Sequence, residues 1–164
     1  MPNDLQAESI PLRRQTVDVG VLLELSTEVM QRQAKALGIS LTLHIDDEVP
    51  DTVRLDRDKI AWAITSLVGS ALRHVRAPGG SVKVSVSRDA EGSGLVITVH
   101  DDGPGIPADR MNRLLHRDSW RPGAALALLL VEDIAVAHGG EIVVESQTGP
   151  SAHFTTVRFT IPTR

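Results

Sequence analysis

The sequence predicts a two-layer α+β sandwich, in which a mixed, mostly antiparallel sheet carries about three helices on one face. Alternating apolar residues over 82–99 and 141–161 are typical of two hairpins. Apolar residues at helical spacing over 19–37, 57–75 and 124–138 are typical of amphipathic or buried helices. The length of 164 residues suffices for one compact domain and is marginal for two.

The first half of the chain alternates short strands with two long helices. In order, the sequence predicts a strand at 16–18, a helix at 19–37, strands at 40–45 and 53–55, and a helix at 57–75. Gly38 is a suitable C-terminal stop for the first helix. Asp56 or Asp58 can cap the second helix.

The second half contains the two hairpins and a third helix between them. A turn rich in Asp, Gly and Pro follows the first hairpin at 101–107, and a mostly polar segment continues to Arg121. The helix at 124–138 is closed by Gly139 and Gly140, and strands follow at 141–145 and about 153–161. The polar residues 1–12 are expected to be a flexible leader, ahead of a single domain over 13–164.

Composition disfavours several classes of protein. The apolar share of 41% and the charged share of 23% are ordinary for a soluble domain. The longest apolar run, 124–131, is far shorter than the ~20 residues of a membrane span, and the N-terminus lacks the order of a secretory signal. The net charge of −4, with no basic stripe, disfavours nucleic acid as a partner. We expect a cytoplasmic protein without a membrane span.

The segment VHDDGPGIP, residues 99–107, is the first candidate site. Gly103 and Gly105 allow the backbone to turn tightly and to approach a ligand closely. Asp101, at the end of a strand, can accept a hydrogen bond from an exocyclic amine such as that of adenine. A plain surface turn explains the same residues, because Asp, Gly and Pro form turns in many proteins.

The second candidate site is the helix over 57–75. Ser66 and Ser70 lie four residues apart on one face, offset from the apolar stripe, with Arg73 nearby. Such hydroxyls can line a polar cleft, or can simply face water. Arg73 and His74 stand in the last turn, where the helix dipole favours cations without any function.

The third candidate site is the beginning of the helix at 124–138. The N-terminus of a helix is a natural anion site, and Pro122 suits a first helical position. A buried structural helix explains the segment equally well, since 124–130 is a run of strong helix formers.

Together these segments resemble the catalytic and ATP-binding domain of bacterial sensor histidine kinases. LDRDKIAWAITSLVGSALRHV resembles the N-box, DDGPGIP the G1 box, and GAALALLLVEDIAVAHGGEIVVES the G2 box with the HGG corner that follows it. The resemblance covers residues 13–163 and implies the Bergerat fold of the GHKL superfamily, which includes DNA gyrase B and heat-shock chaperones. In this family the G1 aspartate receives the adenine amine, a role that falls on Asp101 here. His138 is expected to be a helix-end residue.

The phosphate half of the implied site departs from the family pattern. Ser66 and Ser70 stand where the N-box has two asparagines, and Ser70 occupies the magnesium position. Ala125 and Ala127 replace two G2 glycines, while Gly123 is kept. The implied nucleotide-binding residues are Ser66, Ser70, Arg73, His74, Asp101, Gly103, Gly105, Ile106, Gly123, Leu126 and Leu128.

A hydroxyl is shorter than a carboxamide, and an alanine methyl crowds the backbone where phosphate oxygens approach. A hydrogen bond to a charged partner contributes ~1.5–3 kcal/mol, so losing two such bonds weakens Mg-ATP by roughly a hundredfold or more. The sequence therefore predicts weak binding of ATP or ADP, with magnesium poorly held. The Ala/Leu run is also expected to extend the third helix backward into the family's lid, residues 108–121.

Three functions follow from this resemblance. The chain shows no helical hairpin with a phosphoacceptor histidine, so an active kinase needs a separate phosphoacceptor-histidine or response-regulator protein as its partner. A catalytically inactive pseudo-ATPase that acts as a regulatory or interaction module is the alternative. An anti-sigma-type serine kinase is a weaker third hypothesis, because those proteins also rely on an N-box asparagine, which this sequence replaces by serine.

Overall fold

A five-stranded mixed sheet forms one layer of the molecule. The computed structural model describes residues 11–92, 94–115 and 124–163. The sheet has the strand order β2 (Ser40–Ile45), β4 (Ser81–Arg88), β5 (Gly94–Asp101), β7 (His153–Pro162) and β6 (Glu141–Thr148). Only β2 and β4 pair in parallel, and the other neighbours are antiparallel. The mostly antiparallel sheet predicted from sequence is confirmed.

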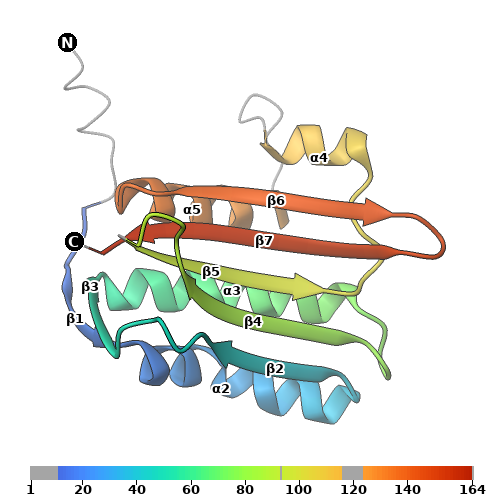
Figure 1. Ribbon diagram of the computed structural model, residues 1–164. Helices are drawn as coiled ribbons and strands as arrows, with labels where there is room; N and C mark the ends of the chain where they lie inside the picture. Colours follow the sequence, from blue (N-terminus) through green and yellow to red (C-terminus); the bar gives the residue numbers. More distant parts are fainter. Residues whose placement is uncertain (1–10, 93, 116–123, 164) are drawn as a thin grey trace.

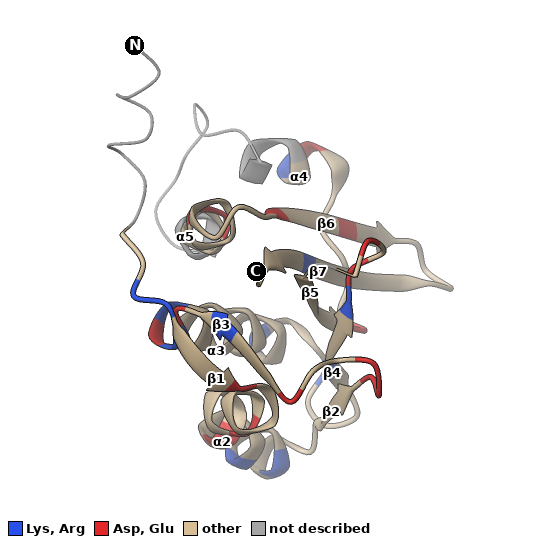
Figure 2. Cartoon of the chain, turned by 60° about the vertical axis from the view of Figure 1, so that its left-hand side comes forward, with Lys and Arg blue, Asp and Glu red and all other residues tan. Residues whose placement is uncertain are grey.

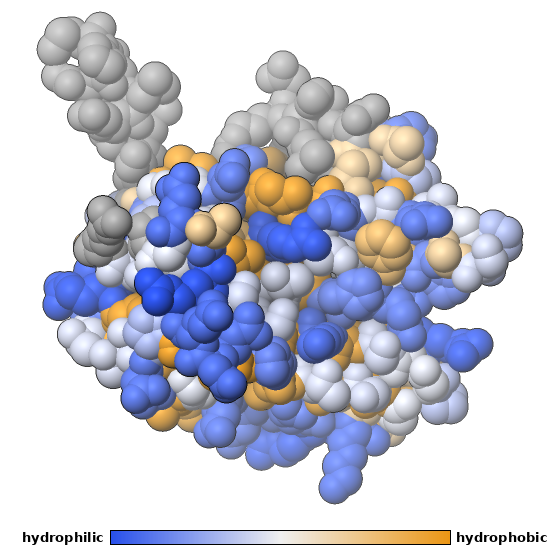
Figure 3. All heavy atoms as spheres, in the orientation of Figure 1, coloured by the Kyte–Doolittle hydropathy of each residue, from blue (hydrophilic) through white to orange (hydrophobic). Residues whose placement is uncertain are grey.

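Three helices form the second layer. The helices α2 (Val19–Leu37), α3 (Arg57–His74) and α5 (Ala124–Ala137) lie on the same face of the sheet (Figures 1 and 2). The core between the layers consists mainly of Leu, Val, Ile and Ala, and Phe159 of β7 is fully buried within it. Seen from the sheet side, most of the surface is hydrophilic (Figure 3). Among the described helices, none is long and apolar enough to cross a membrane.

The ends of α2 and α3 are fixed by capping residues. The Asp18 side chain accepts a hydrogen bond from the Val21 amide at 2.9 Å, and Gly38 closes α2 in the left-handed region with φ 73°. The Asp56 side chain accepts from the Lys59 amide at 3.1 Å. Asp56, not Asp58, is therefore the cap of α3.

Two features differ from the sequence-based expectation. The strands β1 (Gln15–Asp18) and β3 (Thr52–Leu55) pair only with each other, in a separate two-stranded sheet. Part of the expected polar loop forms the helix α4 (Ala108–Leu115), whose first turn carries Asp109 and whose Met111 amide donates to the Pro107 carbonyl at 2.8 Å. The expected backward extension of α5 concerns residues 116–123, which lie outside the described residues, as do residues 1–10 of the expected leader.

His138 links the end of α5 to the beginning of α3. Its ring is 2% exposed, accepts from the Asp56 amide through Nε2 at 3.1 Å, and donates through Nδ1 to the Ile134 carbonyl at 2.8 Å. The Arg13 amide donates to Asp56 Oδ2 at 2.9 Å, so the chain ahead of β1 joins the same junction. His138 is thus more than a helix-end residue, because it connects segments 82 positions apart.

The charges at this junction follow from its hydrogen bonds. Burial lowers the pKa of His138 and keeps the ring neutral, as its acceptor role toward Asp56 requires. For Asp56, burial opposes the charged form, but the Arg13 and Lys59 amides and the Lys59 ammonium outweigh it, so the pKa lies below its ordinary value. The junction therefore combines a neutral imidazole with an ionised carboxylate.

Candidate nucleotide-binding site

A cavity of about 160 Å³ lies between α3, the end of β5, the loop that follows it, and α5. Its lining consists of Leu67, Ser70, Ala71, His74, Val99, Asp101, Pro104, Gly105, Ile106, Arg110, Leu128, Val144, Thr155 and Val157. Apolar walls with a few convergent polar groups are typical of small-molecule sites. The volume is below the ~300–1,000 Å³ of pockets for drug-sized ligands, so the cavity suits a flat base better than a whole nucleotide.

Asp101 is the acidic group of this cavity. It ends β5, is 7% exposed, and accepts the Gly103 amide through Oδ1 at 2.9 Å. Burial raises the pKa of Asp101, against the lowering effects of that hydrogen bond and of His74 and His100. With Oδ1 engaged by the Gly103 amide, Oδ2 is the oxygen of this carboxylate that could accept an N–H from a ligand.

The two glycines after Asp101 are required by close backbone contacts. A Cβ at Gly103 would lie 2.9 Å from Asp101 Oδ1 and 3.0 Å from the His74 carbonyl oxygen. Gly105 has φ +84°, and a Cβ there would lie 2.1 Å from the Gln147 carbonyl oxygen. The next amide, of Ile106, donates to Ser146 Oγ at 2.6 Å. The loop is therefore pressed against α3 on one side and β6 on the other.

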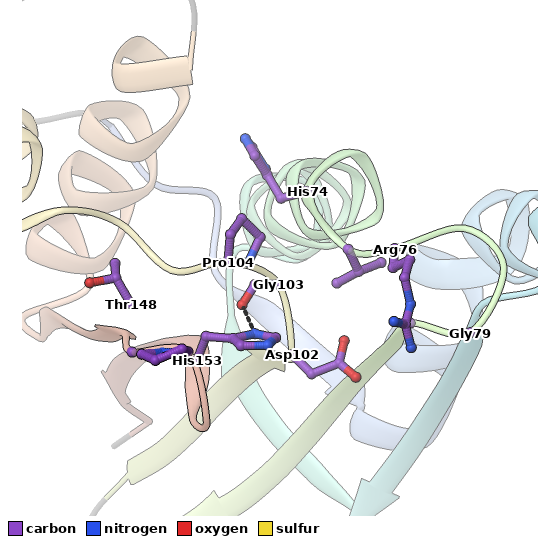
Figure 4. Close-up of a pocket in the computed structure, with 12 residues that line it drawn as sticks. His74, Arg76, Gly79, Asp102, Gly103, Pro104, Thr148 and His153 are labelled. Carbon is purple, nitrogen blue, oxygen red and sulfur yellow. Dashed lines mark hydrogen bonds between the residues drawn. The ribbon is translucent and has the colours of Figure 1, made fainter.

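A second, more open groove lies on the other side of the same loop (Figure 4). It measures about 530 Å³ and is bordered by the end of α3, the β6–β7 turn and residues 102–104. The His153 ring donates through Nδ1 to the Gly103 carbonyl at 2.7 Å, and the Asp102 carboxylate accepts from the Ser81 amide at 2.9 Å. These bonds hold the loop from behind, so that Asp101 is fixed at the cavity.

The structure gathers part of the predicted set around the cavity. Ser70, His74, Asp101, Gly105, Ile106 and Leu128 all line it. Ser66 and Arg73 do not line it although they belong to α3, and Gly103 lines the groove instead. Gly123 and the side chain of Leu126 lie outside the described residues.

Sequence reasoning missed Arg110 and Thr155. Both line the cavity, Arg110 from α4 and Thr155 from β7. The position of Arg110, four residues after Ile106, could have indicated a role at the site. The segment was instead expected to be a loop, and the helix α4 that directs Arg110 toward the cavity was not foreseen. Thr155 is brought in by its pairing with Asp101 across β5 and β7, which the hairpin pattern alone does not specify.

The donor set does not fit the magnesium ion that the family implies. The oxygen-bearing side chains of the lining are Ser70, Asp101 and Thr155. Magnesium in nucleotide sites is usually bound through one or two carboxylates together with phosphates and waters. Ser70, at the family's magnesium position, offers a neutral hydroxyl, and the one carboxylate already accepts a backbone amide. Within the described residues, no group of three or more His, Asp or Glu could hold a metal.

The fold agrees with comparisons to known proteins. The family of histidine kinase-, DNA gyrase B- and HSP90-like ATPases matches residues 55–164, and the chain belongs to this family. Among curated proteins, the alginate biosynthesis sensor protein KinB of Pseudomonas aeruginosa is 36% identical over 140 residues, which is 81% of this chain and 23% of KinB. Sensor histidine kinase ZraS of Escherichia coli (strain K12) is 30% identical over 146 residues, covering 88% of this chain and 30% of ZraS.

The chain thus spans about a quarter to a third of the length of these sensor proteins. Solved structures show the same fold. Full-length ShkA, in complex with AMPPNP, has a TM-score of 0.81 at 24% identity, covering 98% of this chain and 33% of that one. The catalytic domain of histidine kinase ThkA, in a nucleotide-free form, has a TM-score of 0.77 at 19% identity, covering 93% and 97%. The Bergerat-type α+β fold expected from the sequence is confirmed.

Proposed function

We propose that residues 13–164 act as a histidine-kinase-type nucleotide-binding domain of a two-component signalling system, and that this domain has a reduced affinity for ATP. The buried Asp101 at the end of the small cavity carries this proposal, because it offers a carboxylate oxygen to the exocyclic amine of adenine. Val99, Ile106 and Leu128 supply apolar surface for the two faces and edges of a flat base.

The residue at the magnesium position supports the reduced affinity for ATP. Of the two serines at the N-box asparagine positions, Ser70 is the one that lines the cavity, and its hydroxyl does not hold magnesium as an asparagine amide oxygen does. A full kinase reaction would also need a phosphoacceptor histidine on a separate protein, followed by transfer to a response regulator. We propose these as the partners of an active form.

A second function is favoured by the same donor set. A domain that retains the base cavity but lacks a fitting magnesium site can bind nucleotide without transferring phosphate, and can act as a regulatory or interaction module. The two functions differ in turnover, not in base binding. Incubation with labelled Mg-ATP and a candidate phosphoacceptor protein separates them: phosphorylated histidine supports the kinase, and its absence at saturating ATP supports the inactive module.

Base binding is tested with adenosine and two matched variants. Calorimetric titration with adenosine should give a signal for the wild type and for Asp46→Asn, whose side chain pairs with His44 at the surface and does not line the cavity. Asp101→Asn replaces one acceptor oxygen by a donor, so adenosine affinity should fall by at least about tenfold. Equal affinity of the wild type and Asp101→Asn would refute the role of Asp101.

A further inference from the structure

The ionisable side chains that line the cavity are His74, Asp101 and Arg110. Arg110 supplies the guanidinium cation of this set. The cavity thus combines one carboxylate, one imidazole and one permanent cation among its described lining residues.

This balance of charge matters once a nucleotide is placed with its base against Asp101. Each phosphate adds negative charge near a carboxylate already removed from water, where charges interact more strongly than in bulk solvent. In most nucleotide sites a magnesium ion offsets that charge. Ser70 and Thr155 provide only neutral hydroxyls for this purpose. The remaining source of permanent positive charge in the described lining is Arg110.

Arg110 is attached firmly to the loop that holds the base. It lies in the first turn of α4, which begins directly after residues 101–107. The Ile106 amide is bonded to Ser146 Oγ and the Met111 amide to the Pro107 carbonyl, so the chain on both sides of Arg110 is held. The long side chain itself is exposed and free to reach a phosphate at the cavity mouth.

We propose that Arg110 takes the charge-neutralising role of magnesium, and that the ligand of this site is metal-free adenosine diphosphate rather than Mg-ATP. The planar guanidinium can donate two parallel hydrogen bonds to one phosphate group. One such fork matches a terminal β-phosphate but leaves the extra charge of a triphosphate without a partner. This inference rests on the nucleotide function proposed above and specifies its ligand.

The test compares adenosine, ADP and ATP by calorimetry, each in excess EDTA and in excess magnesium. Wild-type protein should bind ADP more tightly than adenosine in EDTA, and magnesium should change the ADP affinity by less than about threefold. Arg110→Ala should lose about 10- to 100-fold in ADP affinity, the range for one charge-assisted contact, while adenosine affinity stays within about twofold. Arg76→Ala, on the groove side of the loop, is the matched control and should behave as wild type.

The results of these titrations distinguish a failure of the Arg110 role from a failure of the nucleotide-binding function. If no variant and no wild-type sample binds adenosine or ADP, the proposed nucleotide function fails, and the role of Arg110 with it. If adenosine binds but Arg110→Ala leaves ADP affinity unchanged, the role of Arg110 alone is refuted. A gain of tenfold or more in ADP or ATP affinity on adding magnesium would likewise overturn the metal-free ligand and leave base binding intact.

Discussion

Replacing His138 by alanine removes the ring that joins α5 to α3. The Asp56 amide then loses its acceptor in a buried place, which costs ~1–3 kcal/mol, and the missing ring leaves a cavity in a position that is 2% exposed. Large-to-small substitutions in cores cost ~2–5 kcal/mol. The Ile134 carbonyl loses the Nδ1 donor of the ring, but it keeps the hydrogen bond from the backbone amide of residue 138, so this second loss costs little. We expect the free energy of unfolding to fall by about 3–5 kcal/mol.

Urea unfolding followed by circular dichroism measures this loss as a lower midpoint. His44→Ala is the control, since 57% of that side chain is exposed and its imidazole pairs with the surface residue Asp46. An exposed substitution of this kind should change stability by less than about 0.5 kcal/mol. A loss of under about 1 kcal/mol for His138→Ala would refute the view that the ring is a structural junction.

The same ring makes stability depend on pH. Burial lowers the pKa of His138 in the folded protein, so below the ordinary value of 6.5 the unfolded chain binds the extra proton first. The stability due to the neutral ring is therefore complete above pH 6.5 and is lost as the pH falls below it. The difference in unfolding free energy between wild type and His138→Gln should shrink over that range, and a constant difference would contradict the neutral assignment.

Three further predictions concern the loop and the cavity. Gly105→Ala should lower the unfolding midpoint and abolish adenosine binding, because the new Cβ would meet the Gln147 carbonyl. Gly92→Ala is the control: Gly92 also has a positive φ, but a Cβ there meets the flexible Arg88 side chain. This control should lower the free energy of unfolding by no more than ~1–2 kcal/mol. Asp101→Asn should be at least as stable as the wild type at neutral pH. Burial raises the pKa of Asp101, so keeping this carboxyl ionised above that pKa lowers the free energy of unfolding of the wild type. A clear thermal destabilisation of the variant at pH 7–8 would contradict this expectation. The combined variant Ser66→Asn, Ser70→Asn, Ala125→Gly and Ala127→Gly should bind ATP more strongly and in a magnesium-dependent way. Unchanged affinity would contradict the proposal that these four positions weaken ATP binding.

Local patterns in the sequence were sufficient for the elements whose ends carry strong signals. Gly38 ends α2 as predicted, and the alternation around Val84 and Ile97 marks the central strands. The pairing of β1 with β3 was not foreseen, because strands of four residues carry too little alternation to indicate a partner. The helix α4 was expected to be a polar loop, since its residues lack a long apolar stripe.

The candidate site was predicted in part for a similar reason. Asp101, Gly105 and Ile106 follow one another along a single loop, so a linear motif finds them together. Arg110 and Thr155 reach the cavity only through the direction of α4 and the register of β7 on β5. Ser66 and Ser70 share a helix face by spacing, yet only Ser70 lines the cavity. The junction of Asp56 with His138 depends on contacts 82 residues apart, which no local pattern contains.

Calorimetric titration of the wild-type chain with ADP in EDTA, beside a titration with Mg-ATP, decides whether the site prefers the metal-free diphosphate. We expect ADP to bind at least as well as Mg-ATP, because Asp101 lines the cavity and the described lining offers no donor set that fits magnesium. Mg-ATP binding at least tenfold tighter than ADP in EDTA, or no heat with either nucleotide, would contradict it.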